Sequence, residues 1–308
     1  MGVSIFTDAG SNLFASLLER EHSAIRVLPM PLQIGGREYL CYDSSLDPEE
    51  FSRGFYSAMR EGSEARTSLP SPGLLEEMAR EEIKRGNQIV FVSMSSGISG
   101  SFQSASLVAE TLNSEVGRTA MAVIDSKTAG FGEGMVALYA EKVAKGQSSF
   151  EMTMKMTEEY VQRVRSEFTV DSLKYLARTG RISKLNAALG NALMIKPILH
   201  GSEEGKIVVI GKTIGRKNAI RKLVSLCAEN IVDRDAKVYI AHCDAAQDAR
   251  EIASGLQEHG IENVEISFYD LITGAHVGPG ALAVFYEGRD RSVKKGFLPG
   301  LAKKPSKS

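Results

Sequence analysis

Residues 92–105 read Val-Ser-Met-Ser-Ser-Gly-Ile-Ser-Gly-Ser-Phe-Gln-Ser-Ala, a stretch of hydroxyls and glycines between two apolar segments. The preceding residues, 89–92, have the continuous apolar character of a buried strand, and the residues after the stretch carry apolar side chains at helical spacing. Ser95 and Ser96 can donate O–H bonds, Gly97 permits close backbone approach, and a helix start adds unpaired N–H groups. The stretch therefore predicts a strand–loop–helix unit whose loop holds an anion without needing a cation.

A second hydroxyl loop strengthens this interpretation. Residues 66–73 read Arg-Thr-Ser-Leu-Pro-Ser-Pro-Gly, so that Thr67 and Ser68 precede a helix start with Ser71 as its N-cap. On the first loop alone, the more ordinary alternative is that Ser99 caps the following helix and the other serines solvate a turn. Two such loops, each leading into a helix, predict one head group held between them.

Composition narrows the class of protein. The chain has 308 residues, enough for two domains of ordinary size, and 37 basic against 38 acidic side chains give a net charge of −1. This balance does not favour nucleic acid or an anionic membrane as the main partner. The three cysteines form neither a Cys-x-x-Cys site nor a disulfide framework, and no apolar run approaches the roughly 18 residues that span a bilayer. We expect a cytoplasmic protein without stable membrane insertion.

Short apolar strands alternate with amphipathic helices along the chain, which is typical of an α/β fold with a mainly parallel sheet. The expected strands are 3–7, 25–34, 88–92, 119–124, 206–212, 237–241, 264–269 and 281–286. On the expected helix 149–165, Met152, Met156 and Val161 should face inward. Ligands bind at the carboxyl ends of parallel strands, so the loops at Asp8, Thr67, Ser95 and Ser126 should meet at one edge.

The expected domain organisation has three parts. Residues 1–165 form an N-terminal α/β domain that carries the hydroxyl loops, and residues 166–290 form a C-terminal α/β domain. Residues 291–308, rich in Lys, Gly, Pro and Ser, are expected to be a disordered basic tail.

Several enzyme motifs are not matched. The sequence Gly-Ile-Ser-Gly-Ser at 97–101 has a serine where a nucleophile elbow needs its last glycine. The glycines at 130–134 have the wrong spacing for a dinucleotide site, and no phosphate loop is present. The five histidines show no zinc-binding spacing. We therefore expect no cofactor, no metal and no catalytic residue of these classes.

Two charged or polar residues lie where a structural role is hard to assign. His276 occupies the glycine-rich stretch 275–280, which we expect to be a turn, and Arg181 is flanked by Gly180 and Ile182. Both are candidate ligand-binding residues.

Six motifs together resemble the DegV family, bacterial fatty-acid-binding proteins that serve as the lipid-carrying subunit of fatty acid kinase. The motifs are residues 6–11, 67–70, 95–101, 173–183, 196–199 and 276–280, which read Phe-Thr-Asp-Ala-Gly-Ser, Thr-Ser-Leu-Pro, Ser-Ser-Gly-Ile-Ser-Gly-Ser, Leu-Lys-Tyr-Leu-Ala-Arg-Thr-Gly-Arg-Ile-Ser, Lys-Pro-Ile-Leu and His-Val-Gly-Pro-Gly. The resemblance covers about residues 1–288. It implies two α/β domains with a long-chain fatty acid buried between them.

The resemblance also implies residue roles and partners. The carboxylate of the lipid would be held at Thr67, Ser68 and the loop of Ser95, Ser96 and Gly97, with Arg181 and His276 near the head group. The protein would be a carrier that presents the carboxylate to a separate kinase catalytic subunit, which forms an acyl phosphate for phospholipid synthesis. An acyltransferase is a further candidate partner.

One departure concerns the segment after the strand at 206–211. Family members often have Lys-x-Arg there, whereas this chain has Lys212-Thr213-Ile214, so the arginine is missing unless Arg216 replaces it. Two alternatives to a lipid carrier stay open from the residues: a serine-dependent acyl hydrolase acting through Ser96 or Ser99, and a non-catalytic regulatory interaction protein.

Overall fold

The computed structural model describes residues 2–42, 48–182 and 194–292. Its N-terminal half is built on a four-stranded sheet in the order β2-β1-β6-β7, in which every pair is parallel. The strands are β1 (Val3–Asp8), β2 (Arg26–Leu28), β6 (Gln88–Ser93) and β7 (Met121–Asp125). The predicted parallel sheet is confirmed.

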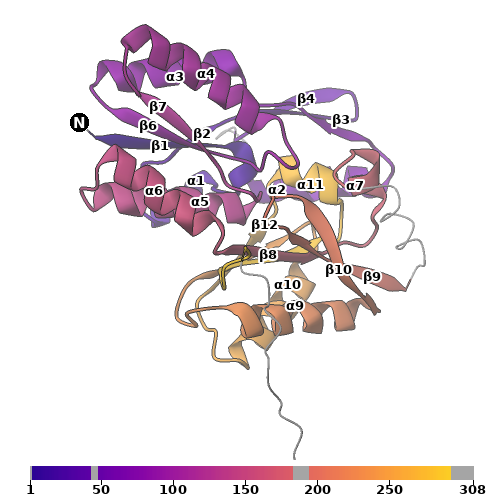
Figure 1. Ribbon diagram of the computed structural model, residues 1–308. Coiled ribbons are helices and arrows are strands. Elements are labelled where there is room, and N and C mark those ends of the chain that lie inside the picture. Colours follow the sequence, from indigo (N-terminus) through magenta and orange to yellow (C-terminus); the bar gives the residue numbers. More distant parts are fainter. Residues whose placement is uncertain (1, 43–47, 183–193, 293–308) are drawn as a thin grey trace, which may run out of the picture.

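Helices cover both faces of this sheet (Figure 1). One face carries α3 (Pro72–Lys84) and α4 (Ser101–Val116), and the other carries α1 (Ala15–Arg20), α5 (Phe131–Lys145) and α6 (Phe150–Val161). Burial on both faces explains why residues 89–92 are continuously apolar. Ser71 caps α3 as predicted, since its hydroxyl accepts a bond from Leu74 N at 3.3 Å.

The expected single strand 25–34 is wrong, because the chain divides it between two sheets. Residues after Pro29 leave β2 and form β3 (Met30–Ile34), which pairs antiparallel with β4 (Arg37–Cys41) and β5 (Ala65–Thr67). Pro29 lacks an N–H donor and so marks the change of sheet. Helix α2 (Pro48–Arg60) follows β4.

The C-terminal half contains a six-stranded mixed sheet in the order β10-β9-β8-β13-β11-β12. Its strands are β8 (Val164–Thr169), β9 (Ile195–Gly201), β10 (Ile207–Ile214), β11 (Val238–His242), β12 (Val264–Phe268) and β13 (Leu282–Glu287). Helices α9 (Arg216–Asn230) and α10 (Ala246–Gln257) pack on one face around a separate apolar cluster. The predicted boundary at residue 165 lies beside the start of β8.

The other face of this sheet is turned toward the N-terminal half (Figure 1). One apolar cluster contains residues of both halves, and the ring of Phe131 on α5 stacks on Tyr239 of β11 with centroids 4.7 Å apart. The short helices η1 (Ala9–Ser11), α7 (Lys174–Arg178) and α11 (Leu271–Val277) lie in this contact region. The two halves therefore share a continuous interior.

Three further expectations need correction. Met152 is 47% exposed, whereas Val161 is buried as expected. The buried positions of α6 are Phe150, Thr153, Thr157, Tyr160 and Val161, whose spacing sets the inward face. His276 is not in a turn but in the last turn of α11, which begins because Asp270 accepts a bond from Thr273 N.

Arg291, expected in the disordered tail, instead donates hydrogen bonds to the carbonyls of Val161 and Ser202. This arginine joins the two halves of the chain. The rest of the expected tail, from residue 293 onward, lies outside the described residues.

Candidate functional site

A cavity of about 400 Å³ lies between the two halves. Its walls are mainly apolar, and the side chains come from both halves: Met30, Leu69, Met94, Ile98, Ala129, Leu176, Ile207, Ile272 and Val277. Its polar lining consists of Thr67, Ser68, Ser99, Arg181, Thr273 and His276. The volume falls in the range of about 300–1,000 Å³ typical of small-molecule sites.

Thr67 and His276 form a polar contact within this lining. Thr67 ends β5 and His276 lies on α11, and Thr67 Oγ1 is 2.9 Å from His276 Nε2. Which atom donates depends on the imidazole tautomer. Among the described residues, His276 Nδ1 has no hydrogen-bond partner although it is buried. The pair therefore offers an unused ring nitrogen together with a hydroxyl.

Burial keeps the His276 ring neutral near pH 7. Desolvation, followed by the nearby charges of Arg181 and Arg178, lowers its pKa to about 4. A neutral imidazole carries one N–H, which can donate to an anion, and one nitrogen that accepts.

Arg181, a predicted ligand-binding residue, supplies a positive charge to the cavity lining. Its Nε donates to Ile98 O at 3.2 Å, and a terminal nitrogen donates to Thr179 O. These bonds hold the guanidinium on the loop that follows β6. Partial burial lowers the pKa of Arg181, and an anionic partner would offset this cost of burying the charge.

The loop of residues 95–97 is placed differently from Thr67, Ser68, Arg181 and His276. Ser95 is fully buried, and its hydroxyl donates to Gly205 O at 2.8 Å. Gly97 N donates to Ser95 Oγ at 3.1 Å, and a Cβ added at Gly97 would lie 2.7 Å from Gly205 O. Within the described part of the chain, Ser95, Ser96 and Gly97 do not line the cavity; Ser95 and Gly97 meet the turn at Gly205.

Ser96 contacts the end of the neighbouring strand β7, as expected for two loops at one sheet edge. The expectation is wrong for Thr67, which ends β5 in the separate three-stranded sheet. The backbone N–H of Ser96 donates to Asp125 Oδ1 at 3.1 Å. Burial raises the pKa of Asp125, but bonds from Lys127 and from the hydroxyl and N–H of Ser96 outweigh it, so the pKa is lowered overall. Ser99 lines the cavity, and its hydroxyl accepts a bond from Ser101 N at 3.2 Å.

Sequence reasoning missed the apolar walls and Thr273. The walls come from residues that are distant in sequence, and each looks like ordinary core on its own strand or helix. Thr273 carried a local signal, because it stands three residues after Asp270, the spacing of a helix cap and its N–H partner. This spacing indicates a helix that ends at His276 instead of a turn.

Among the described residues, no group of three or more histidines, cysteines or carboxylates is arranged to hold a metal ion. Within the same residues, none of the helices has the length and apolar character to cross a bilayer.

Comparison with known proteins assigns the family. Residues 2–289 match a family model described as uncharacterised protein, DegV family. The chain belongs to the DegV family. A DegV domain-containing protein of Clostridium perfringens is 31% identical over 286 residues, which cover 92% of this chain and 97% of the relative.

Solved DegV structures share the fold. A DegV family protein of Thermus thermophilus, described by its fatty acid binding, has a TM-score of 0.80 at 26% identity. The match covers 93% of this chain and 100% of that protein's chain. The fatty acid binding DegV family protein of Streptococcus agalactiae also has a TM-score of 0.80 at 26% identity, over 92% and 98% of the two chains. DegV of Bacillus subtilis, a fatty acid binding protein, is 28% identical with a TM-score of 0.76, over 92% and 98%.

Proposed function

We propose that this protein binds one long-chain fatty acid in the cavity between its two halves. The carboxylate lies at Thr67, Ser68, Arg181 and His276, and the acyl chain runs along the apolar wall. The observation that carries the proposal is a cavity lining that combines a cation and a buried ring nitrogen without a partner among the described residues with walls that are otherwise apolar. The solved relatives that bind fatty acids support it.

The acyl chain and the head group contribute different amounts to the binding free energy. About 15 methylenes at roughly 0.8 kcal/mol each contribute on the order of 12 kcal/mol of gross burial. A hydrogen bond to a charged group contributes about 1.5–3 kcal/mol net. Affinity therefore comes mainly from the chain, and the polar groups set its direction.

We further propose that the protein is a carrier and not an enzyme. The carboxylate is presented to a separate ATP-dependent kinase subunit in the cytoplasm, where a carboxylate oxygen attacks the γ-phosphorus and ADP leaves, giving an acyl phosphate for phospholipid synthesis. Two features support presentation of the carboxylate to a partner. One is the resemblance of the motifs to the family. The other is that Ser68 and Leu69 line the cavity and are exposed, which brings the proposed carboxylate site close to the surface.

The first experiment is mass spectrometry of lipid extracted from the denatured, purified protein. We expect one fatty acid per chain in the wild type and a lower occupancy in a Thr67→Val, His276→Gln double variant. Protein that refolds and carries no acyl chain after incubation with palmitate contradicts the proposal. A chromogenic ester tests the alternative of a serine-dependent hydrolase, and we expect no hydrolysis. A hydrolase needs a base beside its serine, whereas His276 Nε2 contacts Thr67.

The kinase step needs its own measurement. With the kinase subunit, ATP and hydroxylamine, the loaded protein should yield fatty hydroxamate, the trapped form of an acyl phosphate. Loaded protein that yields none with an active kinase subunit contradicts the kinase step alone.

A further inference from the structure

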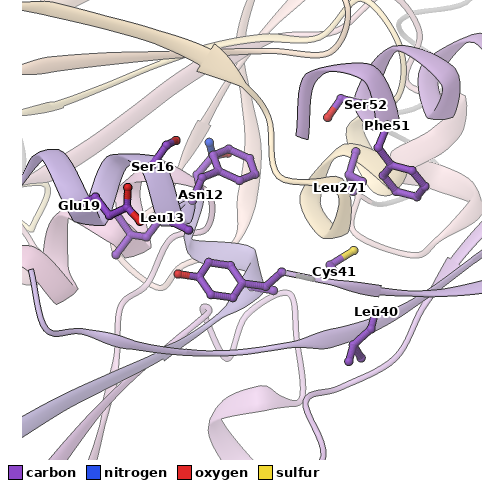
Figure 2. Close-up of a pocket in the computed structure, with 13 residues that line it drawn as sticks. Asn12, Leu13, Ser16, Glu19, Leu40, Cys41, Phe51, Ser52 and Leu271 are labelled. Carbon is purple, nitrogen blue, oxygen red and sulfur yellow. The ribbon is translucent and has the colours of Figure 1, made fainter. Parts of the chain in front are cut away.

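A second cavity, of about 380 Å³, lies at the start of α11. Its walls are the start of α1, the end of β4, the start of α2 and the first residue of α11. Figure 2 shows Leu13, Leu40, Cys41, Phe51 and Leu271 around it. Most of the surface that these residues expose is apolar, so the chamber is suited to hydrocarbon. We refer to it as the distal chamber.

Neighbouring residues line the two cavities at several points, which indicates that a thin layer of side chains separates them. Leu271 lines the distal chamber and the next residue, Ile272, lines the first cavity. Met30 of the first cavity pairs directly across β3 and β4 with Cys41 of the distal chamber. Cross-strand partners have Cβ atoms about 4.5–5.5 Å apart, so one side-chain width separates the cavities here.

Met94 closes the third side of this layer. It lines the first cavity, and its terminal methyl group lies where a Cβ on Gly10 would be, at 2.2 Å from that position. The residue before Gly10 is Ala9, which lines the distal chamber. The absence of a side chain at Gly10 thus leaves the space that the Met94 methyl group fills.

Methionine is the side chain most easily moved in such a partition. It is unbranched, has three rotatable bonds and repacks at low cost. Connecting the two apolar spaces without moving the backbone would require Met30 and Met94 to rotate together away from the layer.

We propose that the distal chamber receives the methyl end of a long acyl chain whose carboxylate lies at Thr67 and His276, and that Met30 and Met94 form a gate between the two cavities. The inference rests on the proposed function and adds the path of the chain and its length selection. Chains short enough for the first cavity leave the gate closed, and longer chains open it.

The charges of the distal chamber favour a methyl end over a head group. Of the described residues that line it, Glu19 is charged and negative, and no lysine, arginine or histidine is present. A carboxylate placed there would lack a cation and face a like charge. The first cavity, with Arg181, has the opposite character.

The chain contains no tryptophan, so a single introduced indole reports on one place. Phe51→Trp and Leu40→Trp each place the reporter in the distal chamber. Because Leu40 is 46% exposed, its replacement by tryptophan should not prevent folding. Leu69→Trp reports on the polar end of the first cavity. Leu107→Trp, on the exposed face of α4, is the matched control for quenching by free ligand.

The ligands are fatty acids brominated at one end, because bromine quenches indole emission only at close contact. We expect ω-bromohexadecanoic acid to remove most of the emission of Phe51→Trp and Leu40→Trp, and ω-bromodecanoic acid to leave it unchanged. α-Bromohexadecanoic acid should quench Leu69→Trp instead. Adding Met94→Phe to Phe51→Trp should abolish the response to the long ω-bromo acid, since a rigid ring keeps the gate closed.

The outcomes separate this inference from the proposed function. If Leu69→Trp responds to the α-bromo acid but neither distal reporter responds to any ω-bromo acid, the distal chamber is not part of the path and the inference is wrong. The inference is also wrong if the α-bromo acid quenches the distal reporters, because the carboxylate end of the ligand then lies in the distal chamber. If Leu69→Trp does not respond and no acyl chain is recovered, the proposed function fails, and the inference fails with it.

Discussion

The hydroxyl of Ser95 donates to the carbonyl of Gly205 at 2.8 Å, across 110 residues of sequence. Gly205 has φ +76, and a Cβ on it would lie 2.0 Å from Ser95 Oγ. This contact docks the loop after β6 onto the turn before β10. Ser95, which the sequence pattern assigned to ligand binding, is thus used in a contact within the protein.

Substitution at this contact should change stability. Ser95→Ala leaves the buried Gly205 carbonyl without its donor, so we expect the free energy of unfolding to fall by about 1–3 kcal/mol. Gly205→Ala should cost more, because it adds both backbone strain and the collision. The double variant should be less destabilised than the sum, since removing the hydroxyl makes room for the new methyl group. Urea unfolding measures all three, and strictly additive values contradict the contact.

Removal of the Thr67 hydroxyl should weaken ligand binding. Thr67→Val keeps the shape of the side chain but loses a bond worth about 1.5–3 kcal/mol, so the Kd for palmitate should rise roughly tenfold to a hundredfold. Thr67→Ser keeps the hydroxyl and is the matched control. Displacement of a fluorescent fatty acid gives both values. Equal affinities for Thr67→Val and the wild type exclude Thr67 from the head-group site.

The charge of Arg181 should matter for the acid and not for a neutral analogue. Arg181→Met should lower the affinity for palmitate while leaving the affinity for hexadecanol nearly unchanged, because only the anion interacts with the guanidinium. Arg80→Met is the matched control, since Arg80 pairs with Glu76 at 2.7 Å on the surface of α3 and does not line the cavity. Calorimetric titration with both ligands tests this. Equal losses for acid and alcohol indicate a packing role instead.

The contribution of the buried carboxyls of Asp270 and Asp8 to stability should fall as pH rises above about 4, because these groups hold their protons in the folded state. His200, His242 and His276, whose pKa values burial lowers to about 4, act in the opposite direction up to about pH 6.5. Burial is the main cause that raises the pKa of Asp270 from 3.8 to about 8 and that of Asp8 to about 6. Between the unfolded and folded values the folded state binds more protons, so each group lowers the unfolding free energy by up to about 1.4 kcal/mol per pH unit.

Asp270→Asn isolates this effect. The amide oxygen can still accept the Thr273 N–H bond that starts α11, but the side chain no longer titrates. We expect a flatter dependence of the unfolding free energy on pH between about 4 and 8, with the clearest difference above pH 6, where Asp8 no longer contributes. Denaturation at several pH values provides the measurement, and parallel curves for variant and wild type contradict it.

Much of the fold follows from local pattern. The buried run at 89–92 and the Ser71–Pro72 helix start both appear where periodicity and capping placed them. Boundaries went wrong where tertiary contacts compete with local preference. The chain changes sheet at Pro29, and His276 lies on a helix because Asp270 begins one in a glycine-rich segment.

By itself, the sequence determined an α/β protein with two hydroxyl loops, an arginine and a histidine suited to an anion, because helix caps, strand burial and side-chain chemistry are local properties. Only the tertiary structure decided which of those groups share a cavity. Thr67 meets His276 across 209 residues, and Ser95 turns to Gly205 instead. That choice depends on how two sheets pack against each other, and such packing is the sum of many distant contacts that no single segment contains.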